Sequence, residues 1–307
     1  MRRALAGFVH VSVLIMLVVA ASHVHAGEIE PRAYGNTPVG VNFLVVGYAH
    51  SEGGLATVAS SPLKDTSLQM NTAVLAYVRT IDLWGKPGKV DVIVPYSDLS
   101  GHAMVGGAYK ERTVSGFHDP LLRLSVNFCG APVLTVKDFS TYRQDLLIGA
   151  SLQVAAPLGQ YDGDKLVNLG NNRWFFKPDL GVSKSWGDVT LEISSGLIIF
   201  TDNNRYYGGT TLHQDPVSTS QLHVIYTIGN GIWASVSGNY DYGGRTRING
   251  VRNADLQGNS RVGVTFAMPV NRNHSIKLYA NNGVDTRSGK DYDLLGIAWQ
   301  YRWGGGL

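Results

Sequence analysis

Charged side chains at the centre of otherwise apolar stretches are the residues of this chain that could do chemistry. In residues 120–128, PLLRLSVNF, hydrophobic side chains alternate with Arg123, Ser125 and Asn127. A period of two indicates a β-strand whose two faces meet different environments. In a soluble sandwich Arg123 would face water outside the core. In an outer-membrane barrel the leucines would face lipid and Arg123 would line the interior.

Enzymatic chemistry is not predicted. The sequence has no G-x-S-x-G, H-E-x-x-H or G-x-x-x-x-G-K-[ST] motif. A lipid hydrolase borne on a barrel needs a Ser and a His together on the lipid face. His223 falls on the polar face of its strand, while His102, His118 and His213 lie in or beside expected loops. We therefore expect no catalytic residues, no metal site and no cofactor.

The N-terminal residues predict a secretory signal peptide over residues 1–26. Arg2 and Arg3 precede an apolar run, and Val24-His25-Ala26 resembles a cleavage site. An uncleaved membrane anchor is the alternative reading of this run. Cleavage after Ala26 would remove two arginines from a chain of net charge +3, leaving about +1. A basic nucleic-acid-binding protein is therefore not expected.

The remainder of the chain suits a large β-structure. Its single cysteine, Cys129, excludes an internal disulfide, which small secreted domains usually need. No second stretch of 18 or more apolar residues follows the N-terminal run, so helical membrane crossing is not expected. Alternating stretches recur instead, each close to the roughly 9–11 residues of a tilted spanning strand. We expect twelve strands, at 38–49, 67–80, 89–97, 120–129, 145–156, 173–184, 188–200, 217–228, 231–242, 259–269, 274–283 and 292–303.

The lengths of the connections favour a membrane barrel over a soluble meander. Gly- and Asn-rich tight turns, such as residues 228–231, alternate in the second half with long polar links. The long links are 98–118, 157–172, 201–216, 243–258 and 284–291. Bacterial outer-membrane barrels have short periplasmic turns and long extracellular loops. The sequence thus predicts an all-β fold, a transmembrane antiparallel up-and-down β-barrel of about twelve strands over residues 27–307. Residues 130–144 are an exception, because this link should be a short periplasmic turn and is long. Either it holds a small periplasmic element or the strand count is wrong there.

Twelve strands enclose an interior that side chains alone do not fill, so the lumen is expected to be polar. A charge facing lipid at mid-depth would cost about 2–4 kcal/mol, which favours placing strand charges inside. The expected pore-lining residues are Arg79, Asp91, Arg123, Lys177, Asp179, Glu192, His223, Asp241, Arg261, Lys277 and Arg302. Their mixed charge predicts a cross-lumen network rather than a strong ion filter. Arg123, Glu192 and Arg261 are the residues that we prefer for a constriction. Alternatively, their charges only compensate one another and keep the barrel stiff.

The long link 98–118 is a second candidate constriction. It carries Met104, Tyr109 and Phe117, and we expect it to fold inward as a constriction or capture site.

Several stretches resemble the family of outer-membrane transporters named for the meta-pathway of phenol degradation. They are PRAYGNTPVGVNFLVVGYA (31–49), DPLLRLSVNFCGAP (119–132), QVAAPLGQYDGDKLVNLGNNRWFFKPDLGVSK (153–184), FTDN (200–203), GGRTRINGVRN (243–253) and the final YRWGGGL. The resemblance covers essentially all of residues 27–307. It implies a barrel channel that admits small aromatic or other organic compounds, and it supplies no catalytic or binding residues.

Residues and resemblance together predict a bacterial outer-membrane channel for passive uptake of small organic solutes. Its expected partners are outer-membrane lipid, the barrel assembly machinery during insertion, and the solutes. Two alternatives stay open: an outer-membrane enzyme acting on lipid or a surface polymer, and a plugged structural or binding barrel.

Overall fold

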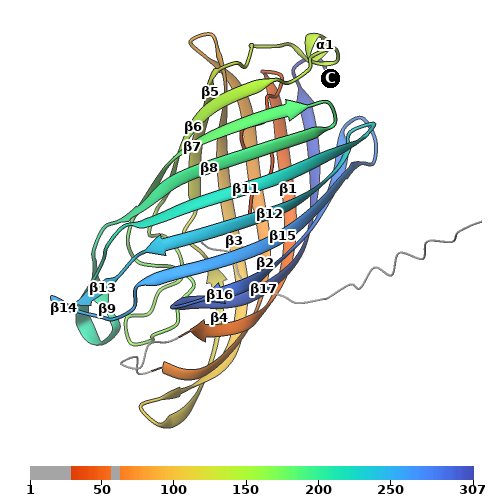
Figure 1. Ribbon diagram of the computed structural model, residues 1–307. Helices are drawn as coiled ribbons and strands as arrows, with labels where there is room; N and C mark the ends of the chain where they lie inside the picture. Colours follow the sequence, from red (N-terminus) through yellow and green to blue (C-terminus); the bar gives the residue numbers. More distant parts are fainter. Residues whose placement is uncertain (1–28, 57–62) are drawn as a thin grey trace, which may run out of the picture.

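The protein is a closed antiparallel β-barrel of twelve strands (Figure 1). The computed structural model describes residues 29–56 and 63–307, and the expected cleavage site after Ala26 lies outside them. The sheet closes on itself because the first strand pairs with both its successor and the last strand, Val46 lying opposite Leu75 on one side and Trp299 on the other.

All twelve expected barrel strands are confirmed, with ends shifted by a few residues. They are β1 (Val41–Ala56), β2 (Leu63–Leu83), β3 (Lys86–Val105), β5 (Leu121–Cys129), β6 (Leu146–Ala155), β7 (Phe175–Trp186), β8 (Val189–Phe200), β11 (Val217–Gly229), β12 (Ile232–Gly243), β15 (Gln257–Pro269), β16 (His274–Thr286) and β17 (Gly289–Gly304). Strands β2 and β3 are the longest, with 21 and 20 residues. Strands β1 to β3 all extend past the expected bounds at the end of the barrel opposite the tight turns, which we call the outer end.

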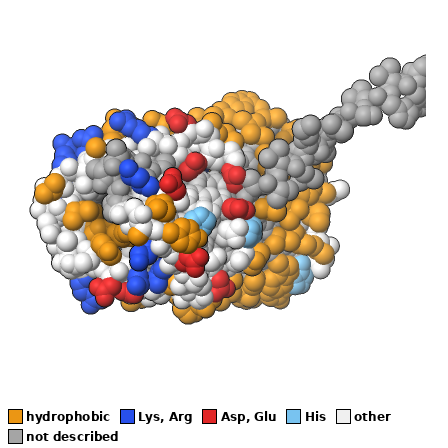
Figure 2. Space-filling model, turned by 90° about the horizontal axis from the view of Figure 1, so that it is seen from below, with side chains coloured by type: hydrophobic (Ala, Val, Ile, Leu, Met, Phe, Trp, Pro, Cys, Tyr) orange, Lys and Arg blue, Asp and Glu red, His pale blue; other side chains and the backbone are white. Residues whose placement is uncertain are grey.

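The two faces of the wall follow the alternation of the sequence. On β5, Leu122 and Leu124 are 52% and 45% exposed, while Ser125 and Asn127, at the alternate positions that follow, are buried. The exposed leucines therefore lie on the outward side and the polar side chains on the inward side. Seen from the outer end, hydrophobic side chains cover the flank and charged side chains gather over the end of the barrel (Figure 2).

The inner end of the barrel carries the tight turns. Asn230 and Gly231, with φ of 52° and 80°, occupy the two central positions of the β11–β12 hairpin, a conformation that Asn-Gly adopts readily. The exceptional link 130–144 contains a one-turn helix, α1 (Val136–Phe139), capped by the Thr135 hydroxyl. It lies at the same end as the tight turns (Figure 1), so the link holds a small element and the expected strand count stands.

The long link 98–118 is a strand hairpin and not an inward-folding loop. The outer half of β3 pairs with β4 (Ala108–Phe117), Met104 lying opposite Tyr109. Tyr109 and Phe117 are 58% and 56% exposed, and the Phe117 ring packs edge-on against Tyr96 at 5.1 Å. The expectation that Met104, Tyr109 and Phe117 constrict the lumen is therefore wrong, because the strand pattern continues beyond the barrel and keeps them on its outward side.

Two other outer links form a small second sheet. Its strands are β9 (Asn203–Tyr206), β10 (Thr210–Gln214), β13 (Thr246–Ile248) and β14 (Val251–Arg252), in the order β14-β13-β10-β9, with the short 3₁₀ turn η1 (Tyr207–Gly209) between β9 and β10. Figure 1 places it at the outer end of the wall. Across the described part of the chain, no helix has the length and apolar character to cross a membrane.

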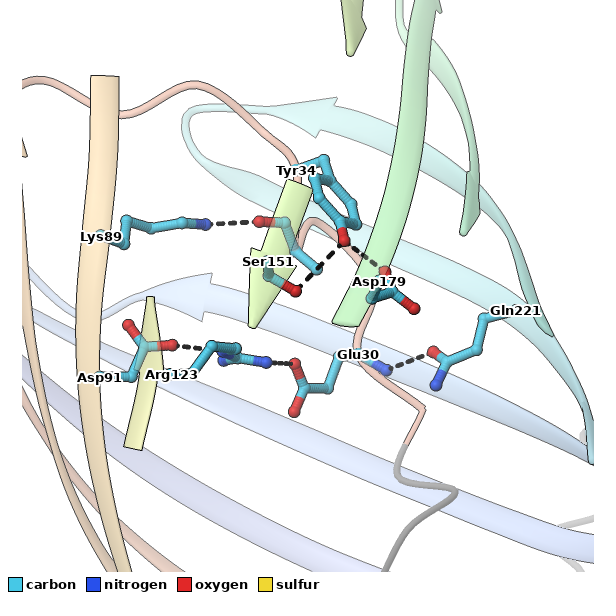
Figure 3. A network of polar contacts seen from close by, with 9 residues as sticks. Glu30, Tyr34, Lys89, Asp91, Arg123, Ser151, Asp179 and Gln221 are labelled. Carbon is cyan, nitrogen blue, oxygen red and sulfur yellow. Dashed lines mark hydrogen bonds and ion pairs between the residues drawn. The ribbon is translucent and has the colours of Figure 1, made fainter. Parts of the chain in front are cut away.

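Residues 29–40, which precede β1, run through the interior of the barrel. They form no strand, and the side chains of Glu30 and Tyr34 point at the inward faces of wall strands (Figure 3). We call residues 29–40 the inner segment.

Candidate functional site

An ion-pair chain crosses the lumen through the inner segment. The Arg123 Nε on β5 donates to Asp91 Oδ2 on β3 at 2.6 Å, and its Nη1 donates to the Glu30 carboxylate. The backbone amide of Glu30 in turn donates to Gln221 Oε1 on β11 at 3.2 Å (Figure 3). A single residue of the inner segment thereby links two separate parts of the wall.

Tyr34 forms the second contact of the inner segment with the wall. Its hydroxyl donates to the Asp179 carboxylate on β7 and lies 3.4 Å from Ser151 Oγ on β6. The ring lies on Gly149 and Gly181, which are directly opposite each other across β6 and β7. A Cβ added at Gly181 would stand 2.1 Å from Tyr34 Cε2, so only glycine leaves room for the ring there.

Backbone contacts fix the rest of the inner segment. Lys89 Nζ on β3 donates to Ala33 O at 2.5 Å, and Asn127 Nδ2 on β5 donates to Tyr34 O at 3.0 Å. Toward the inner end, the Val39 amide donates to Leu134 O at 2.9 Å, next to α1. The inner segment is thus attached at several depths, from β11 down to the link that carries α1.

The surroundings of Glu30 keep its carboxyl group ionised. Burial by itself raises the pKa of this carboxyl, but the charge and hydrogen bond of Arg123 outweigh it, with Lys177 and Lys277 adding to the effect. The resulting pKa is about 2, against a usual value of 4.5. Glu30 is therefore a carboxylate at neutral pH, and its ion pair with Arg123 is fully formed.

Most of the expected pore-lining residues lie on the inward face, but the structure does not bring them all together. Asp91 and Arg123 meet through the ion-pair chain, Asp179 binds Tyr34, and the Glu192 carboxylate faces the backbone of Ala33 and Tyr34. Elsewhere on the wall, His223 Nδ1 lies 2.8 Å from Ser237 Oγ and Asp241 accepts from Asn239 Nδ2 at 3.2 Å. The other inward-facing members of the set are Lys177, Arg261, Lys277 and Arg302.

Arg79 is the exception, and its expected place in the lumen is wrong. It is exposed and shares the outward face of β2 with Leu75 and Tyr77. Its Nη1 donates to Asn42 Oδ1 at 3.3 Å, beside Tyr77 and Trp303, whose rings are 6.2 Å apart. Arg79 thus lies in a belt of aromatic side chains near the strand end, where a long cationic side chain reaches the interface and escapes the cost of facing lipid at mid-depth.

The inner segment itself was missed by the sequence analysis, which assigned no role to Glu30, Arg32 or Tyr34. The signal for it is weak. Residues 29–37, IEPRAYGNT, are polar and charged, contain a proline, and stand just before the first alternating stretch. Such a composition fits an exposed linker equally well, because the partners that bind it come from strands far along the chain.

Solved structures of outer-membrane proteins share this fold. The COG4313 outer membrane channel from Pseudomonas putida F1 matches with a TM-score of 0.77 and 21% identity, over 90% of this chain and 100% of that one. The translocator domain of the autotransporter NalP from Neisseria meningitidis matches with a TM-score of 0.50 and 6% identity, over 88% of this chain and 91% of that one. No curated protein matches in sequence.

The apolar outward face and the shared fold place the protein in the bacterial outer membrane. A family model described as "Putative MetA-pathway of phenol degradation" matches residues 50–301. Since this match spans most of the sequence, the chain belongs to that family.

Proposed function

We propose that the protein is a passive outer-membrane channel for small organic, including aromatic, solutes, and that the inner segment restricts its lumen. The wall has a polar inward face of mixed charge, as a water-filled path requires. The family is named for phenol degradation, and the similar Pseudomonas protein is itself described as a channel.

The observation that carries the proposal is how the inner segment is held. Its contacts include the Glu30–Arg123 ion pair, the Tyr34–Asp179 hydrogen bond and the Arg32–Thr227 hydrogen bond, with Arg32 also lying over the Trp233 ring. The other contacts are single hydrogen bonds, and residues 29–40 form no strand with the wall. Water can replace such contacts one by one. Release of the inner segment therefore requires no opening of the barrel sheet.

A plugged binding barrel is the second candidate function. The inner segment would make the protein such a barrel if its contacts with the wall never break. An enzymatic role is not proposed. Catalysis on lipid would need a nucleophile and a base together at the outward face. His223 lies on the inward face and is 1% exposed, and His274, on the outward face, stacks on the rings of Trp299 and Tyr301.

Single-channel conductance in a planar bilayer tests the proposal, comparing the protein with its Tyr34→Ala variant. We expect small, flickering steps for the protein and larger, longer openings for Tyr34→Ala, because the variant loses the Asp179 contact and the ring on Gly181. Tyr109→Ala, in the outer hairpin, is the matched control and should behave like the unaltered protein. Folded barrels that stay silent in both forms would support the plugged barrel instead.

A further inference from the structure

A partly open, mostly apolar cavity lies inside the outer end of the barrel. It has a volume of about 170 Å³ and is lined by the outer parts of β1, β2, β3 and β17 together with residues 166–169 of the link between β6 and β7. Four of the surrounding side chains, Leu68, Met70, Leu99 and Leu169, form one buried cluster with exposed fractions of 8% or less. A solute entering from outside would meet this space before it reaches the inner segment.

His118 reaches the cavity through a bulge in the wall. Phe117 lies opposite Tyr96 and Leu121 lies opposite Ile93, so residues 118–120 face only two residues of β3. The His118 amide donates to Pro95 O at 3.0 Å, and its side chain turns inward, where it is 2% exposed. His118 continues the alternation from Phe117, which is 56% exposed on the outward side, and bulges are common next to binding sites.

A buried hydrogen-bond chain holds the His118 ring in place. Its Nε2 lies 2.7 Å from Ser97 Oγ, which lies 2.7 Å from Thr72 Oγ1. His118 lines the cavity, but Ser97 does not and is 0% exposed. The Ser–His pair therefore offers no accessible nucleophile, and the chain positions the imidazole toward the cavity.

The link that covers one side of the cavity is held by Asp119, the residue after His118. The Asp119 carboxylate accepts from the amides of Gly159 at 2.9 Å and Asn171 at 2.7 Å. Between those two points, Arg112 Nε on β4 donates to Val167 O at 3.2 Å. The bulge thus supplies a polar group for the cavity and the attachment for its lid.

An aromatic ring forms part of the opposite wall. Tyr292 on β17 lines the cavity, and the Arg261 guanidinium lies over its ring, 3.2 Å from the centroid. A cation on a ring face fixes the ring and leaves its remaining surface for packing. Arg261, expected to constrict the pore, supports this wall instead.

We propose that this cavity is a binding site for a neutral single-ring aromatic molecule, with the ring among Leu68, Met70 and Leu99 and a small polar substituent directed at His118. The volume supports this class, since an apolar cavity of about 150 Å³ in another protein takes up benzene. Met sulfur and aliphatic side chains pack well on an aromatic ring. The site deepens the proposed channel function, on which it rests for its biological role.

Methionine methyl spectra of the full mature protein in detergent test the site, with phenol and toluene as the probes. Residues 27–307 contain three methionines: Met70 on the cavity wall, Met104 in the outer hairpin and Met268 on the outward face. We expect phenol to shift the Met70 signal saturably while Met268 stays in place. A stationary Met70 signal with both probes, or a Met268 signal that moves in parallel, would overturn the proposal.

Two pairs of variants sharpen the result. Leu99→Phe fills the cavity and should weaken phenol binding at least tenfold, whereas Leu124→Phe, on the outward face, should leave it unchanged. His118→Leu should abolish the preference for phenol over toluene while toluene still shifts Met70. Conductance is read separately: a conducting barrel with no Met70 shift refutes the site alone, and a Met70 shift in a barrel that never conducts refutes the channel alone.

Discussion

At the scale of single residues, one carboxylate of the inner segment organises the lumen. Glu30 pairs with Arg123, and Arg123 pairs with Asp91, so each charge is compensated by a neighbour from a different part of the chain. Lys177, Lys277, Lys89 and His223 are the other charged or titratable side chains whose charge acts on or is influenced by Glu30. A change at Glu30 should therefore alter the attachment of the inner segment more than the wall itself.

Glu30→Gln should raise the open fraction of the channel at neutral pH. The amide keeps the shape but loses the charge, and a hydrogen bond to a charged partner contributes about 1.5–3 kcal/mol. That corresponds to roughly a ten- to hundredfold shift toward the released inner segment. Open probability in a planar bilayer measures it, with Glu111→Gln in the outer hairpin as the control. Equal open probabilities for the two variants would show that the ion pair does not hold the segment.

Acid should release the inner segment through the same group. The pKa of Glu30 is lowered to about 2 in the bound state, and it should return toward 4.5 when the segment is free. The stabilisation by Glu30 is thus complete above pH 4.5 and is lost as the pH falls toward 2. Conductance should be the same at pH 7 and pH 5 and should rise between pH 4 and pH 3. The Glu30→Gln variant should lack this rise, and a rise of equal size in it would assign the transition to another group.

At the scale of elements, the glycines of β6 and β7 decide where the inner segment docks. Gly149 and Gly181 create a flat patch on a wall that elsewhere carries side chains, and the Tyr34 ring covers it. Neither glycine has a positive φ, so both positions accept an L-residue in backbone terms. The reason for glycine here is the close approach of the ring.

Gly181→Ala should displace Tyr34 and increase conductance without unfolding the barrel. Its new Cβ would clash with the ring, whereas the Cβ of Gly238→Ala, the control on β12, would have only Arg261 O within reach, at 3.8 Å. In a Tyr34→Ala background, Gly181→Ala should have no further effect, because the clash is gone. Conductance of the four combinations measures the coupling, and additive effects would argue against the ring-on-glycine contact.

The sequence predicts the strands of this barrel well and its interior attachments poorly, for a physical reason. Alternation is imposed on each strand locally by lipid on one side and polar groups on the other, so the strand around Arg123 can be predicted from its own residues. The partner of Arg123 cannot be predicted in this way, since Glu30 lies 93 residues away and belongs to no periodic pattern. Arg79 was misplaced because alternation cannot report depth, and near the interface a guanidinium is tolerated on the outward face. The His118 bulge likewise breaks the period that the prediction relies on.

At the scale of the whole molecule, the barrel separates two environments with one layer of strands. Outward leucines, valines and aromatic side chains contact lipid. On the inward face, charged and polar side chains pair with one another and with the inner segment. Size selection in such a barrel belongs to whatever occupies the lumen, because the wall is fixed by hydrogen bonds between all twelve strands. The channel proposal therefore assigns gating to the inner segment and stability to the wall.

The assignment of stability to the wall predicts a strong effect of charge on the lipid face. Val264, at the middle of β15, is 54% exposed on the outward side, next to Val236 of β12. Val264→Arg should lower the free energy of unfolding by about 2–4 kcal/mol, the cost of an arginine near the bilayer midplane. Val251→Arg is the matched control, since Val251 is 70% exposed in the outer sheet, away from lipid. Guanidinium titrations of the barrels folded into vesicles measure both. Because the Val264 side chain points outward, on the opposite side of the wall from the inner segment, the Val264→Arg barrels that still fold should conduct normally. A change in conductance without a loss of stability would mean that wall and gate are not separate.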